Sequence, residues 1–159
     1  MKKILTLLLI TAAFSIVNAQ IAYSPLVDSL KNEVTEAGVT GIIEKLSGET
    51  EVTIGGQPYT LVTRHSYSSF NPLAAQWILE QFEDMGIPVE YHYFGSNGEN
   101  VVATITGSQF PDQQYIICAH YDDMPSGNLA PGADDNASGV AGVLEAARLL
   151  KDQDLKYTV

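Results

Sequence analysis

A short apolar run, followed by polar residues, a loop and a periodic helix, constrains this chain more than any other feature. The apolar run covers residues 115–119 and ends in His120-Tyr121-Asp122-Asp123. A continuous apolar run of this length is typical of a strand buried on both faces, as in parallel sheets. Beyond the loop, apolar residues recur at three- and four-residue steps, which predicts an amphipathic helix. These positions are Val140, Val143, Leu144, Ala147 and Leu150.

This order places an imidazole and several carboxylates where a strand ends and a helix begins. In open α/β sheets, ligands bind beyond the carboxyl ends of the strands. Free N–H groups at a helix start also favour negative charge. Taken singly, His120 is more often an ordinary hydrogen-bonded histidine, and Asp134 and Asp135 are more often helix caps. The combination is more specific than its parts.

The rest of the sequence predicts further helices and strands. The expected helix starts are Ser24-Pro25, Thr40 and Asn71-Pro72, with Gly86 ending the third helix. Further strands are expected at residues 52–54, 59–62, 89–94, 101–106 and 156–159. This order favours an α/β fold, with a three-layer α/β/α arrangement around a mixed, mostly parallel sheet. A last strand without a following helix favours an incomplete sequence, with a short natural tail as the alternative.

The N-terminus has the pattern of a secretory signal peptide. Lys2 and Lys3 precede a mostly apolar stretch at residues 4–17, and a small residue stands at the expected cleavage position. A membrane anchor is the alternative, but the stretch is short and contains hydroxyl residues. We therefore expect residues 1–19 to be removed and residues 20–159 to form part of one domain. The protein would be secreted or periplasmic, without membrane contact after cleavage.

Charge and cysteine content exclude some partners and cross-links. Without Lys2 and Lys3, six basic residues face 19 acidic ones, a net charge of −13. Such a chain repels phosphates, which argues against a nucleic-acid partner. Cys118 is the single cysteine, so no internal disulfide can form. Its position in the apolar run predicts a buried, inert thiol; a metal ligand or a reactive thiol is the alternative.

The combined pattern resembles the secreted co-catalytic di-zinc aminopeptidases of peptidase family M28, the bacterial leucyl aminopeptidase-like group. The resemblance is carried by the apolar run ending in His120-x-Asp122, the loop with Pro131-Gly132, and the sequence GADDNASG at residues 132–139 before an apolar helix. It is sharpest over residues 115–150 and extends more weakly back to about residue 63. It covers roughly the first half of such a catalytic domain.

The resemblance implies roles for three residues. His120 would bind one zinc ion, and Asp135 would bridge two zinc ions. Asp122 would accept the other ring N–H of His120 and support catalysis through it. A cis peptide bond would follow Asp135. The implied activity is the removal of N-terminal residues from peptides or proteins by a metal-bound hydroxide.

The family pattern also calls for residues that have no place in this chain. They are a Glu-Glu pair, a further acidic residue and a distal histidine, all downstream of residue 159. Since catalytic zinc normally has three protein ligands, we expect this chain to be inactive alone. Two other interpretations stay open: a glutaminyl cyclase-like enzyme of similar fold with one zinc ion, and a non-catalytic exported binding domain. The oligomeric state and the preferred substrate side chain are not indicated.

Overall fold

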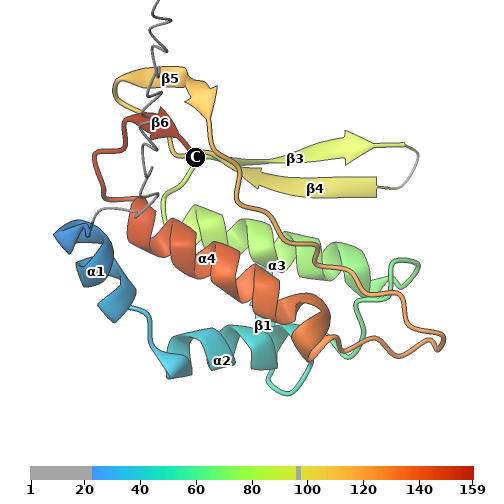
Figure 1. The fold of residues 1–159 in the computed structure, drawn as a ribbon. Coiled ribbons are helices and arrows are strands. Elements are labelled where there is room, and N and C mark those ends of the chain that lie inside the picture. The colour runs from blue at the N-terminus through green and yellow to red at the C-terminus, as the bar shows by residue number, and fades with distance from the viewer. Residues whose placement is uncertain (1–22, 96–97) are drawn as a thin grey trace, which may run out of the picture.

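A computed structural model describes residues 23–95 and 98–159 of the chain. The predicted signal peptide, residues 1–19, lies outside the described residues. Within the described ranges, no helix is long and apolar enough to cross a membrane. The elements form layers: a β-hairpin lies over two packed helices, and a third helix with a second hairpin lies beneath them (Figure 1).

The described residues contain four α-helices. They are α1 (Pro25–Asn32), α2 (Glu36–Leu46), α3 (Phe70–Asp84) and α4 (Ser138–Leu150), of which α1 buries none of its residues. The expected start of α2 after Thr40 is wrong. Thr35 has an extended backbone and its hydroxyl accepts the Gly38 N–H at 3.1 Å, so the helix is capped one turn earlier. α1 starts at Pro25 after the capping residue Ser24, as expected, whereas α3 starts at Phe70, one residue before the expected Asn71. Gly86 follows α3 with a positive φ of 72°.

The strands form three two-stranded sheets. The antiparallel pairs are β1 (Val52–Ile54) with β2 (Gln57–Tyr59) and β3 (Val89–Phe94) with β4 (Gly98–Ala103); the parallel pair is β5 (Phe110–Gln114) with β6 (Tyr157–Thr158). The described residues are thus α/β in class, but their sheets are small. Among their named strands, parallel pairing is limited to β5 and β6, and an isolated parallel bridge joins His65 and Asp123.

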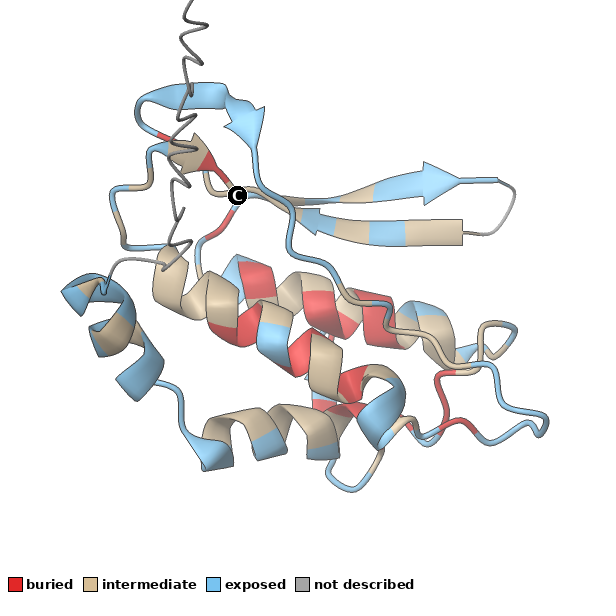
Figure 2. Cartoon of the chain, viewed as in Figure 1, coloured by how far each residue is buried: buried red, intermediate tan, exposed pale blue. Residues whose placement is uncertain are grey.

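The hydrophobic core lies where α3 and α4 meet β1 and the end of α2. Its most deeply buried large apolar side chains are Leu46, Leu61 and Leu144, each at most 1% exposed. Trp77, Ile78 and Phe82 supply the face of α3 that packs into the same cluster. Figure 2 shows this burial along the facing sides of α3 and α4. The core therefore fixes α4, the helix that follows Asp134 and Asp135 in the chain.

The predicted buried strand at residues 115–119 is wrong for the described structure. The strand forms earlier, at β5, and the run continues as an extended, largely exposed segment (Figure 2). Ile116 is 83% exposed, and Cys118 is exposed rather than buried. A strand of this kind is buried by neighbours on both sides. Here, the run makes one backbone hydrogen bond to a described strand. The Tyr115 N–H donates to the Thr158 carbonyl at 2.9 Å.

An apolar groove of about 1360 Å³ runs beside this segment. Residues of β4, α3, α4 and the run itself line it, together with His120 and Asp122. Two of the polar residues that the sequence singles out therefore border the groove.

Candidate metal centre

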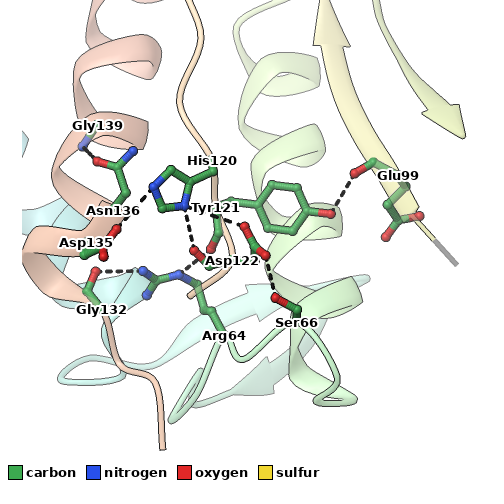
Figure 3. Close-up of polar contacts among 10 residues, drawn as sticks. All are labelled: Arg64, Ser66, Glu99, His120, Tyr121, Asp122, Gly132, Asp135, Asn136 and Gly139. Carbon is green, nitrogen blue, oxygen red and sulfur yellow. Dashed lines mark hydrogen bonds and ion pairs between the residues drawn. The ribbon is translucent and has the colours of Figure 1, made fainter. Parts of the chain in front are cut away.

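His120 and Asp135 lie together at one end of the fold. Nε2 of the His120 ring is 3.2 Å from Oδ1 of Asp135. Figure 3 shows the ring between this carboxylate and Asp122. His120 follows the extended segment, and Asp135 precedes α4. We call the stretch that joins them, residues 120–135, the site loop.

The orientation of the His120 ring is set by its other nitrogen. Nδ1 lies 2.9 Å from the backbone carbonyl oxygen of Asp122. Because a carbonyl can only accept, Nδ1 carries the proton and the lone pair of neutral imidazole is on Nε2. Nε2 and Asp135 Oδ1 are then two electron-pair donors facing each other. A cation between them, either a proton or a metal ion, satisfies both.

Asp122 lies where it can accept the other ring N–H of His120, but through its backbone carbonyl and not through its carboxylate. Its carboxylate Oδ1 is 3.6 Å from Nδ1 of His120, which is too long for a hydrogen bond, so the carbonyl of Asp122 holds the ring instead. The carboxylate Oδ2 accepts a bond from the Ser66 hydroxyl at 2.5 Å. Ser66 thereby fixes the carboxylate beside the ring.

The backbone around Asp135 is unusual. A wide turn, η1 (Ala133–Ala137), contains non-helical dihedral angles at Asp135 and Asn136, and the peptide bond between them is cis, as the resemblance implies. The Asn136 side chain accepts the Gly139 N–H at 3.0 Å and so caps the start of α4. Gly132 precedes the turn with a φ of +55°, where a Cβ would collide with the Asp135 carbonyl oxygen. This turn directs the Asp135 carboxylate away from the helix, where it is 77% exposed.

Arg64 is the main site residue to which the sequence assigned no role. Its side chain is fully buried, although arginine is rarely so unless it is paired. The guanidinium donates to four backbone carbonyl oxygens, those of Leu46, Tyr121, Pro131 and Gly132. The resemblance reaches residue 63 only weakly. The burial of Arg64 cannot be predicted from its sequence neighbours, because it depends on contacts with residues far along the chain.

Burial changes the acid–base properties of two residues here. Desolvation lowers the pKa of Arg64, and the negative charges of Asp123, Asp122 and Asp135 partly offset this by raising it. Burial also raises the pKa of Tyr121, with a smaller contribution from Glu99. The Tyr121 hydroxyl donates to the Glu99 carbonyl oxygen at 3.0 Å, which joins the site loop to β4.

The donors present fit a zinc ion in kind but form an incomplete set. An imidazole nitrogen and a carboxylate are both usual zinc ligands, and the other ring nitrogen is held by a carbonyl, as metal-binding histidines require. In the part of the chain that the structure describes, no group of three or more His, Cys, Asp and Glu residues is arranged to hold a metal ion. His120 and Asp135 would therefore be two ligands of a larger set.

Comparisons with known proteins find relatives that are named probable zinc metalloproteases. A protein of Pyricularia oryzae named probable zinc metalloprotease is 30% identical over 155 residues, covering 84% of this chain and 30% of that protein. A Pyrenophora teres f. teres protein of the same name is 29% identical over 159 residues, covering 82% of this chain and 34% of its own length. A third, from Pyrenophora tritici-repentis, is 42% identical over 71 residues, covering 42% of this chain and 16% of that protein.

The chain spans about a third or less of the length of these curated relatives. The sequence profile described as Peptidase family M28 matches residues 100–159, the range that contains the apolar run, the site loop and α4. Over the segment that carries His120, Asp122 and Asp135, this chain therefore matches Peptidase family M28.

Proposed function

We propose that this chain is the N-terminal part of an exported zinc aminopeptidase. The observation that carries the proposal is the 3.2 Å approach of His120 Nε2 to Asp135 Oδ1 within the segment that matches Peptidase family M28. The names of the relatives, probable zinc metalloprotease, support zinc as the metal and a peptide bond as the target. The substrates would be peptides or proteins, and the complete enzyme would hold two zinc ions.

Each residue has a distinct task in this proposal. His120 would ligate through Nε2, with its ring held by the Asp122 carbonyl. Asp135 would bridge two ions through its two carboxylate oxygens, since this carboxylate is exposed and its Oδ1 lies near the ring. Asp122, fixed by Ser66, would add negative charge beside the ring and support its basicity. Bound zinc supplies a Lewis acid and lowers the pKa of a water ligand towards about 7.

The same proposal extends to the architecture and the compartment. The complete domain would have three α/β/α layers around a mostly parallel sheet, in which residues 115–119 become an inner strand. The parallel pairing of β5 with β6 and the apolar groove beside residues 115–119 support this. The signal pattern at residues 1–19 supports a secreted or periplasmic protein.

The test compares this chain with a polypeptide that includes the downstream part of the enzyme. The longer protein should hydrolyse aminoacyl amides, lose activity with a chelator and regain it with zinc, while the 159-residue chain should be inactive. H120A and D135A should each abolish activity in the longer protein, whereas H92A, which changes an exposed histidine on β3, should not.

Three outcomes would contradict the proposal. Full activity in H120A or D135A would show that these two residues do not hold a catalytic zinc ion. Ammonia release from N-terminal glutamine peptides without cleavage would indicate a glutaminyl cyclase. A correctly folded longer protein without zinc, by elemental analysis, would indicate a binding domain.

A further inference from the structure

We propose that Arg64, assisted by Thr63, is a positioning residue that sets the distance between His120 and Asp135. It would act as a clasp across the site loop, holding its two ends against the end of α2. The part of this inference that concerns metal binding rests on the proposed zinc site. The part that concerns the geometry of the loop stands without it.

The guanidinium contacts both ends of the site loop at once. Its Nε donates to the carbonyl oxygen of Tyr121 at 2.7 Å, next to His120. Its Nη2 donates to the carbonyl oxygen of Gly132 at 2.7 Å, just before the turn that holds Asp135 (Figure 3). Nη1 donates to the carbonyl oxygens of Pro131 and Leu46, and Leu46 ends α2. One planar group thus connects three separate segments.

The backbone of residues 63 and 64 repeats this connection. The Arg64 N–H donates to the Ala130 carbonyl at 2.7 Å, and the Arg64 carbonyl accepts the Asp123 N–H at 3.0 Å. The Thr63 hydroxyl accepts the Ala130 N–H at 3.0 Å and donates to the Asn128 carbonyl at 3.1 Å. Each end of the loop is therefore held by the side chain of Arg64 and by the main chain beside it.

A role in core packing alone does not explain this arrangement. Burying a cation is costly unless its hydrogen bonds are satisfied, and an apolar side chain would fill the same volume without that cost. The bonds of Arg64 go to carbonyl oxygens, whose positions they fix. Lysine has one nitrogen and cannot reach acceptors on three segments, so the planar fork of arginine is needed.

Hydrogen exchange on the 159-residue chain tests the clasp without any metal. In R64A and R64K, amides of the site loop should exchange about tenfold to a hundredfold faster, because buried carbonyls lose their donors. Amides of α3 and of the β3–β4 hairpin should keep their wild-type rates. The control is R148A, which removes an arginine that bonds Glu145 on α4 and the Glu33 carbonyl away from the loop.

Zinc titration and chemical rescue separate positioning from general stability. If the wild-type chain binds zinc, R64A should bind it about tenfold more weakly, in the range seen when supporting residues of a metal site are removed. Millimolar methylguanidinium should restore affinity to R64A but not to R64K, whose side chain blocks the space. R148A should bind zinc like the wild type.

The outcomes decide the inference in each case. Faster exchange confined to the site loop, with rescue by methylguanidinium, supports the clasp. Unchanged loop exchange in a folded R64A, or equally faster exchange throughout the chain, overturns it. Should R64A not fold, T63V keeps the shape but removes the hydroxyl, and unchanged exchange at Ala130 and its neighbours would overturn the inference. A wild-type chain that binds no zinc contradicts the proposed function, while hydrogen exchange still decides the clasp.

Discussion

Nε2 of His120 lies 3.2 Å from Oδ1 of Asp135, although one residue ends an extended segment and the other precedes α4. When Nδ1–H donates to the Asp122 carbonyl, Nε2 and Oδ1 both direct electron pairs towards the space between them. The pair is brought together by residues outside it, above all Arg64, which bonds both ends of the site loop. A cation site at this position would therefore depend on the surrounding backbone as well as on His120 and Asp135.

Replacing Gly132 with alanine should disturb the site directly. Its φ is +55°, and a Cβ there would lie 2.7 Å from Arg64 Nη2 and would overlap the Asp135 carbonyl oxygen. We expect G132A to lose about 1–3 kcal/mol of unfolding free energy because the crowded loop must shift, in addition to a backbone penalty of about 1–2 kcal/mol for the positive φ. Its zinc affinity should fall about tenfold. Denaturant unfolding and calorimetric zinc titration measure the two effects.

A matched control exists in the β1–β2 hairpin. Gly56 has a φ of +77°, but no atom lies within 4 Å of the position that a Cβ would take there. G56A should therefore cost only the backbone penalty of about 1–2 kcal/mol and leave zinc binding unchanged. Equal zinc affinities in G132A and G56A would show that crowding at Gly132 does not affect the site.

Local signals predicted much of the fold, but not the elements that depend on distant neighbours. Proline and glycine punctuation located α3 and its end at Gly86, and apolar spacing located α4. Residues 115–119 have the composition of an inner strand, yet whether they form one depends on strands beside them. Thr35 and Thr40 are both threonines, so residue type alone does not show which of them caps α2. The extended backbone at Thr35 makes it the cap.

The site, like the fold, was predictable only where it depends on residues that are close together in the sequence. His120 and Asp135 stand in a local motif, so their residue types and their spacing in the sequence are enough to indicate them. The role of Arg64 depends on carbonyl groups of Leu46, Tyr121 and Gly132, which are far from it in sequence. Backbone carbonyls occur at every residue, so no sequence pattern marks the ones that a buried guanidinium will contact.

The thiol of Cys118 should react without unfolding. The side chain is exposed in the described structure, although the sequence predicted a buried position. A thiol reagent should modify about one equivalent per chain in native buffer within minutes, as accessibility allows. Reaction that requires denaturant would contradict the exposed position and would favour residues 115–119 as a buried strand in solution.

Tyr121 should make the chain less stable at alkaline pH. Burial raises its pKa, and burial also raises the pKa of Tyr91 to about 12. Above about pH 10, the ordinary tyrosine value, the unfolded chain has lost these protons while the folded chain keeps them. The folded state then binds more protons, so the free energy of unfolding falls as the pH rises from about 10.

Y121F isolates the contribution of Tyr121. At neutral pH it should be less stable by about 1 kcal/mol, because the bond to the Glu99 carbonyl is lost. Above about pH 10 its stability should fall less steeply than that of the wild type. Urea unfolding across pH 7 to about 11 measures this, with Y67F as the control, since Tyr67 is 86% exposed. Parallel slopes for Y121F and the wild type would exclude a raised pKa at Tyr121.

Calorimetric titration of the 159-residue chain with zinc at neutral pH tests the central claim most directly. The wild type should bind about one equivalent at the His120–Asp135 pair, since this chain offers only part of a catalytic ligand set. H120A and D135A should each lose this binding by about tenfold or more, while H92A should keep it. Equal zinc affinity in all four proteins would show that the pair is not a metal site.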